Sequence, residues 1–338
     1  MTLGFTPSIE LYGANAARLN ERLISWTHID AAGIESDQLT LTLDIEGLEG
    51  LPELGGKVGL RVGYLESGLV DRGEFIITRR TPNLFPPRLT LVATAAPFKV
   101  ADATGFKQRR SASHGPTTLG ALFRQLTSRH GFSPRVAPEL DSIPVPHVDQ
   151  CNETDMSFLT RIARPHDAVT KPLNEMYVLA LRGQAKSLSG KILSPVRLSV
   201  TRDNRPGDPA FISASIDENG RAKHKGCQAT WWDSAAGKER VVKLGQTPFQ
   251  TLRQRYPGEG EARSAAQGAM RRIEREAIKL KLDCPGDPSL SAEGLVLLDN
   301  SWPAFMQGTW SIDKVTASGS REKNYRCMIE ATCLEQQP

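Results

Sequence analysis

Histidine is the residue type in this chain best suited to acid–base catalysis or zinc binding, and the sequence contains six of them. None has the i, i+4 spacing with an intervening glutamate that builds a helical zinc site. His166 and Asp167 are the most suggestive pair, but side chains of adjacent residues do not easily hydrogen-bond in a productive geometry. We interpret His166 as a helix-end histidine that favours the negative end of the helix dipole. The histidines are His28, His114, His130, His147, His166 and His224.

A nucleophilic serine or a phosphate-binding loop would show as a short glycine-containing motif, and neither motif occurs. Gly-x-Ser-x-Gly is absent, and the nearest string, residues 317–320, lacks the flanking pattern of a strand-to-helix elbow. Residues 55–59 contain glycines but no helix pattern follows them, so we interpret them as a turn. Paired carboxylates for glycoside cleavage would be assembled in space, and nothing in the sequence points to them. We therefore predict no catalytic residues, no metal site and no cofactor.

Cysteine spacing and charge argue against further classes of site. The five cysteines form no Cys-x-x-Cys pair, which indicates neither a disulfide framework nor a zinc site. The net charge of +4 is small, and the one dense basic run, residues 107–110, has no interleaved aromatic residues. We expect this run to be a solvated loop and the protein to have no specific nucleic-acid partner. Trp231 and Trp232 could pack one ring and expose the other, which would suit an interface.

The sequence also lacks the patterns of membrane insertion. No run approaches the roughly 18 apolar residues that a membrane-spanning helix needs, and the N-terminus has neither the basic nor the apolar region of a signal peptide. We expect a chain without a membrane anchor, made in a cytoplasm. Its 338 residues are enough for two or three domains with sizeable cores.

Helical patterns occur in three places. Residues 117–130 carry apolar residues at helical spacing and stop at Gly131, and residues 261–275 carry a stripe of alanines beside Ile273. A helix over residues 152–164 is predicted to start at an Asn152 cap with Asp155 in the capping-box position, and Pro165 should end it early. The buried side of this helix is predicted to consist of Phe158, Leu159 and Ile162. Between the second and third helices, strands are predicted over residues 177–181, 196–200 and 228–232, with a hairpin turn at Asn219 and Gly220.

The elements that frame these helices form an internal repeat. Residues 52–96 and 288–333 carry the same order of alternating strands at an offset of about 236 residues, and each copy is preceded by a similar strand, at residues 39–47 and 278–286. Chance similarity between β segments is the alternative explanation, but four matched segments in one order exceed what strand periodicity alone usually gives. The residues that mark the repeat are Gly73, Phe75 and Ile77 in the first copy and Gly308, Trp310 and Ile312 in the second.

These patterns together resemble the phage late-control D family, the hub proteins of contractile tails. The resemblance rests on the Pro-x-Leu-Gly and Gly-x-Phe-x-Ile segments of the first copy, on Gly308-Thr-Trp-Ser-Ile312 of the second, and on residues 152–163. The last segment is similar to a helix start that the family shares with the valine-glycine repeat proteins of type VI secretion. Pro165 departs from the family pattern and puts the length of that helix in doubt.

The resemblance implies a mainly β fold with an α+β insertion, in which two similar antiparallel β-barrel tube domains flank a middle α+β region. The implied domains are a first tube-like barrel at residues 1–97, a middle region at 98–260, and a helix with a second tube-like barrel at 261–338.

The implied function is that of a structural baseplate hub, a homotrimer joining the sixfold tail tube to the threefold central spike. Its implied partners are the spike protein, the tail tube or tube-initiator protein, the tape-measure protein and other baseplate proteins. It would be made in the bacterial cytoplasm and assembled into the baseplate of a phage, a phage-tail bacteriocin or another injection machine. The alternatives are a peptidoglycan-degrading tail enzyme and a DNA-binding late regulator, and the lack of a basic recognition helix argues against the regulator.

Overall fold

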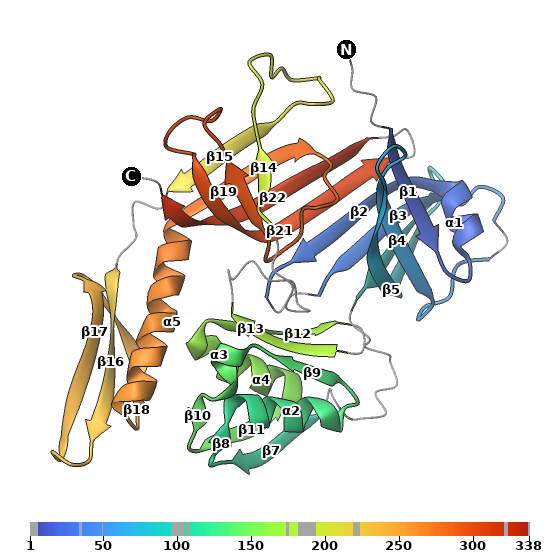
Figure 1. Cartoon of the computed structure of the whole chain (residues 1–338). Helices are drawn as coiled ribbons and strands as arrows, with labels where there is room; N and C mark the ends of the chain where they lie inside the picture. The colour runs from blue at the N-terminus through green and yellow to red at the C-terminus, as the bar shows by residue number, and fades with distance from the viewer. Residues whose placement is uncertain are drawn as a thin grey trace.

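A computed structural model of the chain describes residues 6–33, 36–48, 50–95, 105, 108–173, 176–181, 194–218, 224–320 and 324–336. Within these ranges strands outnumber helices, and the helices lie mainly in two insertions (Figure 1), which confirms the predicted mainly β fold. One 12-stranded sheet runs through the upper part of the molecule and carries both copies of the repeat.

The first half of the sheet is an antiparallel arrangement with the path β1-β4-β5-β6-β3-β2. Alternating apolar residues such as Leu39, Leu41 and Leu43 are buried, while the residues between them lie on the other, polar face. Its elements are β1 (Pro7–Tyr12), α1 (Ala16–Arg22), β2 (Leu23–Ala31), β3 (Gln38–Asp44), β4 (Lys57–Tyr64), β5 (Gly68–Asn83) and β6 (Arg88–Thr94).

The second half follows the same path in the order β14-β20-β21-β22-β19-β15. Strand by strand, β1, β2 and β3 therefore correspond to β14, β15 and β19, and β4, β5 and β6 to β20, β21 and β22. One difference is that β14 pairs with β20 in parallel, whereas β1 pairs with β4 antiparallel. The bounds are β14 (Val196–Leu198), β15 (Ser213–Glu218), β19 (Ile278–Pro285), β20 (Leu295–Leu298), β21 (Gly308–Ser320) and β22 (Tyr325–Gln336).

The halves are joined edge to edge, because β2 of the first half pairs antiparallel with β21 of the second. Their buried apolar side chains form one continuous cluster that includes Leu60 and Phe75 from one half and Leu282 and Trp310 from the other. The prediction of two β-barrels is not confirmed, because no sheet closes within the described part of the chain. Since β2 reaches across to β21, each half is an open segment of a longer sheet.

A compact α+β unit is inserted between the two halves and lies below the sheet in Figure 1. Its core is built from α2, α4 and the sheet β12-β13-β9 and includes Phe123, Phe158 and Tyr177. The elements are β7 (Arg109–His114), β8 (Thr117–Thr118), α2 (Leu119–Arg129), β9 (Ser133–Val136), α3 (Pro138–Asp141), β10 (Pro144–Val145), β11 (Val148–Thr154), α4 (Asp155–Ala163), a 3-10 turn (Arg164–His166), β12 (Ala168–Leu173) and β13 (Met176–Leu181).

A second insertion separates β15 from β19, at the place where β2 and β3 of the first half are joined by a short link. It consists of β16 (Lys225–Asp233), β17 (Lys238–Gln246), β18 (Phe249–Tyr256) and α5 (Glu259–Ala277). The alanine stripe of α5, with Ala262, Ala266 and Ala269, packs against this three-stranded sheet. Because of this insertion, β14 and β15 lie within residues 98–260 of the sequence although they pair with strands of the C-terminal sheet.

The three predicted helices are confirmed, with one error in a helix start. Helix α2 begins after Thr118, whose hydroxyl oxygen accepts a hydrogen bond from the Ala121 N–H. Helix α4 is capped by Thr154, which accepts from the Ser157 N–H, and the predicted Asn152 cap is wrong. Asn152 instead lies in β11 with a positive φ of 49°, at an irregularity in the β7–β11 pairing. Thr154 takes the capping role because it directly precedes the first helical residue.

Helix α4 ends at Ala163, before Pro165, as predicted. Arg164 nevertheless keeps helical backbone angles, because it starts the 3-10 turn that contains Pro165. The predicted strands correspond to β13, β14 and β16. The predicted turn at residues 219–220 and Lys107 of the basic run lie outside the described residues, and Arg109 of that run begins β7.

Candidate functional site at the junction of the two halves

The residues that mark the repeat in the sequence lie at matching places in β5 and β21. Gly73 and Gly308 both have positive φ angles, 91° and 126°, which glycine adopts without strain. Phe75 and Trp310 follow two residues later and are 0% and 1% exposed. Both rings therefore belong to the shared core, where Trp310 also donates its ring N–H to the Met306 carbonyl at 3.0 Å.

The third member of each triplet makes the same pair of backbone hydrogen bonds. Ile77 donates to the Gly56 carbonyl at 2.9 Å and accepts from the Gly55 N–H at 2.8 Å. Ile312 donates to the Gly294 carbonyl at 2.9 Å and accepts from the Glu293 N–H at 2.9 Å. Directly after each isoleucine the pairing to the next strand shifts register, between Ile77 and Arg79 in β5 and between Ile312 and Lys314 in β21. The two copies therefore agree in backbone hydrogen bonding and strand register, and not only in the order of their apolar residues.

The two halves meet along a ladder between β2 and β21 that runs from Ser25 opposite Ser320 to Ala31 opposite Lys314. Gly319 is required there, since a Cβ at this position would lie 2.3 Å from the Asn324 carbonyl oxygen and 2.7 Å from the indole nitrogen of Trp26. Trp26 is buried beneath the ladder, and its ring lies 5.7 Å from that of Tyr325. A glycine on one strand thus admits a large ring from the other half.

Side chains of the first half also hold loops of the second. The Tyr64 hydroxyl donates to the Gly286 carbonyl at 2.5 Å, and Arg72 donates to the Pro288 carbonyl at 2.7 Å. In the next loop, the Ala292 N–H donates to the Asp30 carboxylate at 3.0 Å. These contacts fix the angle between the halves more firmly than a strand ladder alone, because they tie loops on both sides of it.

Lys171 of the α+β unit inserts into the same junction. Its ammonium group donates to the Ala31 carbonyl at 2.8 Å and to the Asp37 carboxylate at 2.6 Å. Burial and the nearby Asp30 raise the pKa of Asp37 to about 6, although Lys171 acts in the opposite direction. Burial also lowers the pKa of His28, whose ring packs edge-on against Phe75 at 5.4 Å, to about 4. The junction therefore contains a buried ion pair and a histidine that is neutral at physiological pH.

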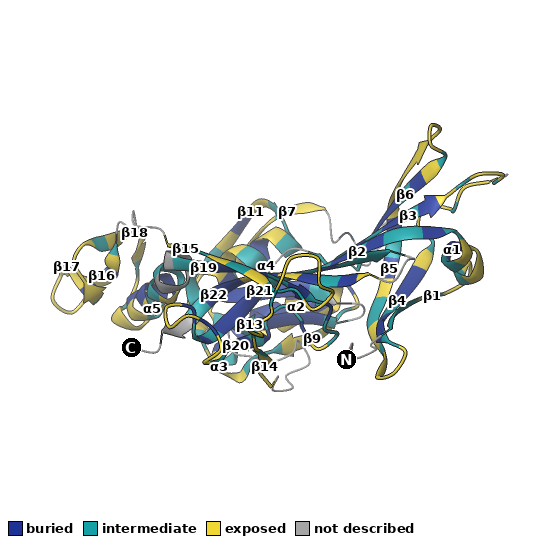
Figure 2. Cartoon of the chain, turned by 90° about the horizontal axis from the view of Figure 1, so that it is seen from above, coloured by how far each residue is buried: buried dark blue, intermediate teal, exposed yellow. Residues whose placement is uncertain are grey.

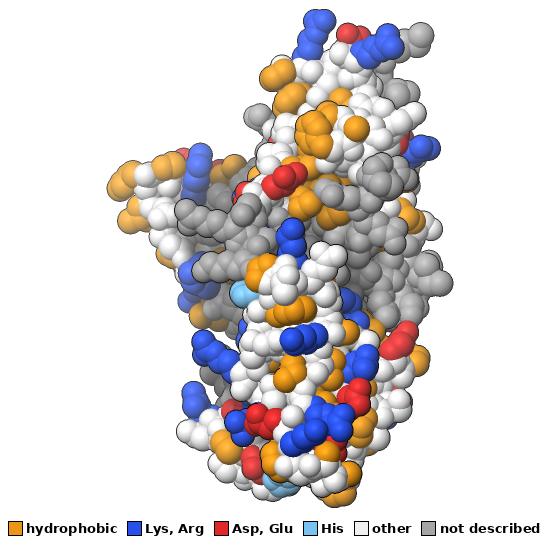
Figure 3. Space-filling model, turned by 90° about the vertical axis from the view of Figure 1, so that its left-hand side faces the viewer, with side chains coloured by type: hydrophobic (Ala, Val, Ile, Leu, Met, Phe, Trp, Pro, Cys, Tyr) orange, Lys and Arg blue, Asp and Glu red, His pale blue; other side chains and the backbone are white. Residues whose placement is uncertain are grey.

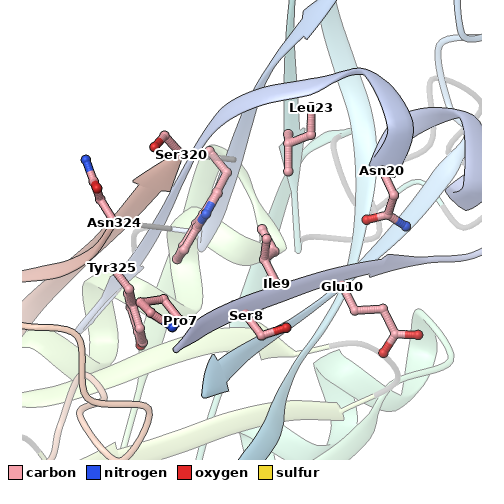
Figure 4. A pocket seen from close by; sticks show the side chains of 10 residues that line it. Pro7, Ser8, Ile9, Glu10, Asn20, Leu23, Ser320, Asn324 and Tyr325 are labelled. Atoms are coloured by element: carbon pink, nitrogen blue, oxygen red, sulfur yellow. The ribbon is translucent and has the colours of Figure 1, made fainter. Parts of the chain in front are cut away.

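A pocket opens at one end of the junction, between β1 and β2 of the first half and the ends of β21 and β22 of the second (Figure 4). Glu10 is the one carboxylate in its lining, and it is paired with Arg61 at 3.1 Å. The lining contains two serines but no histidine or cysteine, so it offers no pair of nucleophile and base. Pro7, Ser8, Ile9, Glu10, Asn20, Leu23, Trp26, Ser320, Asn324 and Tyr325 line the pocket.

The residues predicted to form the family's helix lie in the α+β unit, away from the junction. Phe158 and Leu159 are fully buried, and Ile162 packs against the same core. Asp155 is also buried, and it accepts hydrogen bonds from Gln150 at 2.8 Å and from His130 at 2.7 Å. Burial alone would raise the pKa of Asp155, but these hydrogen bonds and the charge of nearby groups outweigh it and lower the pKa. These side chains organise the core of the unit.

His166 and Asp167 pack against α5. The His166 ring lies 3.2 Å from the Ser264 hydroxyl, and Arg271 lies 3.5 Å from the Asp167 carboxylate. Gly268 permits this approach, since a Cβ there would lie 2.2 Å from the Pro165 carbonyl oxygen. The pair thus connects the two insertions. Among the residues that the structure describes, no three histidine, cysteine or acidic side chains gather as metal ligands would.

The outer surface near the second insertion carries mixed charges. Figure 3, which looks onto the side of the molecule that lies at the left in Figure 1, shows lysine and arginine side chains scattered among acidic ones. Trp231 packs against the core of β16–β18 and α5, whereas Trp232 on the opposite face of β16 is 51% exposed. None of the described helices is long and apolar enough to span a membrane.

Comparison with known proteins gives two relatives by sequence, whereas no family model matches the chain. It is 34% identical over 230 residues to the probable baseplate hub protein of Escherichia phage 186, a match that covers 68% of this chain and 56% of that protein. It is 31% identical over 214 residues to the probable baseplate hub protein of Escherichia phage P2, covering 63% and 52%. The chain thus matches about half the length of these relatives.

Solved structures of low sequence identity share the fold over nearly the whole chain. The tail protein of Neisseria meningitidis MC58 is 12% identical with a TM-score of 0.67, covering 98% of both chains. The 43 kDa tail protein of prophage MuSo2 from Shewanella oneidensis is 11% identical with a TM-score of 0.64, covering 96% of this chain and 98% of that one. An Escherichia coli component of the type VI secretion system is 12% identical with a TM-score of 0.56, covering 97% and 77%. The predicted resemblance is therefore confirmed: this chain is a homologue of the baseplate hub proteins of phages P2 and 186 and has the fold of phage tail proteins.

Proposed function

We propose that this chain is a structural baseplate hub, a homotrimer that joins the sixfold tail tube of a contractile particle to its threefold central spike. The observation that carries this proposal is the duplicated sheet, whose halves share one strand path and are joined edge to edge. Three such chains would offer six similar sheet units around one axis while keeping threefold symmetry. The names of the two sequence relatives support the same function.

In this assembly the predicted tube domains are completed between chains. Each half is an open sheet with one apolar face in the core and one polar face, as expected of a segment of a tube wall. Six such segments around an axis remove the open edges that a single chain leaves. The function is mechanical, and the partners would be the tail tube or tube-initiator protein, the spike, the tape-measure protein and other baseplate proteins of the particle.

The test is the mass and symmetry of the purified protein. Light scattering coupled to size exclusion should give three copies, and electron-microscopy averages should show a ring of six similar units related by about sixty degrees. A stable monomer at all concentrations, even with the spike protein added, would contradict the proposal.

A further inference from the structure

The contact between Lys171 and Asp37 joins two side chains that are both largely withdrawn from solvent. Exposed residues, yellow in Figure 2, are prominent on the projecting hairpins and outer turns of the molecule. By contrast, the side chains of Lys171 and Asp37 are 5% and 14% exposed, and Nζ lies 2.6 Å from Oδ1. Lys171 lies in β12 of the α+β unit, whereas Asp37 directly precedes β3 of the large sheet. A buried amine held against a buried carboxyl group is a pair that can condense to an amide.

We propose that Lys171 and Asp37 form an isopeptide bond in the folded protein, which joins the α+β unit covalently to the junction of the two halves. The structure shows the pair before reaction, and the bond accumulates with time once the chain has folded. It forms within one chain, so it depends neither on trimer formation nor on a second protein. The two residues thus make up a site of covalent modification.

The reaction is a condensation between the two side chains alone. A bond forms between Lys171 Nζ and Asp37 Cγ, the bond from Cγ to Oδ2 breaks, and Oδ2 leaves as water with two of the three ammonium protons. The Nζ–Oδ1 distance of 2.6 Å places Nζ within about 4 Å of Cγ, near the roughly 3–3.5 Å of a reactive arrangement. A small rotation of the Asp37 carboxyl group brings the amine onto the face of Cγ.

The backbone of Ala31 suits both the reactants and the product. Its N–H donates to Oδ1 of Asp37 at 3.3 Å, and its carbonyl oxygen accepts from Nζ of Lys171 at 2.8 Å. Negative charge develops on Oδ1 during the attack, where the Ala31 N–H stabilises it. The amide product has one N–H and one carbonyl group, and Ala31 offers a partner to each. The bond therefore replaces a buried charge pair, which is costly to desolvate, by a neutral group with its hydrogen bonds intact.

The charges around the pair favour transfer of the proton from the amine to the acid. Burial and the charge of Asp30 raise the pKa of Asp37 to about 6, against the opposing effect of Lys171. A carboxyl group with a raised pKa takes up the ammonium proton at lower cost, and this transfer gives the neutral amine and neutral acid that react. His28 is the other titratable group beside them, near the charges of Asp30, Arg72 and Lys171. Burial lowers the pKa of His28 to about 4, so it is neutral at physiological pH and does not compete for the ammonium group.

The mass of the intact full-length protein tests the bond. On incubation of the folded wild type at pH 7.5, a species lighter by one water, about 18 Da, should accumulate. Trypsin should then release residues 23–57 joined to residues 162–182, since Arg164 and Lys171 both precede proline and are not cleaved. The two residues are 134 positions apart, so the reacted chain should also run faster than the unreacted chain on a denaturing gel. Protein incubated unfolded in urea should keep its full mass.

Two variants separate the amide from other causes of mass loss. Lys171→Arg is the matched control, because a guanidinium group keeps the positive charge but does not condense, and this variant should keep its full mass. In Asp37→Asn, attack of Lys171 on the new carboxamide releases ammonia, so the loss should be about 17 Da with the same branched peptide.

Wild-type protein that keeps its full mass throughout the incubation would overturn the proposal. A loss of water that persists in Lys171→Arg would overturn it too, since it would report closure of an aspartate onto its own backbone. Either result leaves the hub proposal standing, because that proposal is tested by the number of copies in the particle. A monomeric protein that contains the branched peptide would contradict the hub and support the bond.

Discussion

Removal of the Lys171 ammonium group should destabilise the junction more than removal of a typical surface lysine. In the Lys171→Met variant the Asp37 carboxylate stays buried but loses the donor at 2.6 Å, and the Ala31 carbonyl loses the donor at 2.8 Å. Breaking a buried ion pair by removing one partner costs about 3–5 kcal/mol. At roughly 2 °C per kcal/mol for a chain of this size, the melting temperature should fall by at least about 6 °C at pH 7.5.

The pH dependence of this loss follows from Asp37. Its pKa of about 6 lies above the value of about 4 expected in the unfolded chain, so the folded protein holds a proton between these pH values that the unfolded protein has released. The contribution of Asp37 to the free energy of unfolding therefore falls as pH rises through this window. Without Lys171 the pKa rises further. The deficit of the variant should accordingly be largest at pH 7.5 and shrink by at least about half at pH 5.

Calorimetry at both pH values checks this reasoning. It compares the wild type, Lys171→Met, and the double variant Lys171→Met with Asp37→Asn. The double variant should recover at least about half of the loss at pH 7.5, since an amide at residue 37 removes the buried charge and keeps an acceptor for the Ala31 N–H. A deficit that is equal at pH 5 and pH 7.5, or below about 2 °C throughout, would refute the claim that the ion pair stabilises the junction.

Three further predictions concern other parts of the fold. Trp310→Ala should cost about 3–5 kcal/mol of unfolding free energy in urea because the ring is fully buried, and a loss below about 1 kcal/mol would contradict its place in the core. Thr154→Ala should lower the free energy of unfolding by about 1 kcal/mol by removing the α4 cap, whereas Asn152→Gly should be neutral or slightly stabilising because the φ of Asn152 is 49°. Thermal melts of both variants check this, and a larger loss in Asn152→Gly than in Thr154→Ala would contradict it. Gln150→Leu removes a hydrogen bond that lowers the pKa of Asp155. The variant should therefore be less stable than the wild type at pH 7, and the difference should fade below about pH 4 as Asp155 becomes protonated. An equal loss at pH 3.5 and pH 7 would argue against a role of Gln150 in stabilising the Asp155 carboxylate.

The repeat could be found from the sequence where strand periodicity is strong. Leu39, Leu41 and Leu43 alternate in β3 as Leu280 and Leu282 do in β19, and all five side chains are buried. The match of β15 to β2 could not be found in this way. β15 has few apolar residues, and an insertion of three strands and a helix separates it from β19, so neither its pattern nor its distance in sequence resembles that of β2.

The pairing of β2 with β21 at the junction was harder to predict from the sequence. Which strands pair across two similar halves depends on edges that become adjacent only after both sheets form, and no local pattern specifies that choice. Lys171 was a signal that could have been used, because a lysine inside a strand of otherwise apolar and β-branched residues needs a buried partner. The need for glycine at residue 319 becomes clear only when the ladder that places it opposite Trp26 is known.

The placement of the two insertions bears on how the proposed ring would form. A ring closes only if every junction turns the chain by the same fraction of a full circle, so an accurate angle at β2–β21 is itself a functional requirement. The α+β unit fixes this angle from outside the sheet through Lys171, and the second insertion supports that unit through Ser264 and Arg271. Both insertions enter the chain away from the β2–β21 ladder. They can therefore brace the angle within a chain without contributing a strand to that ladder.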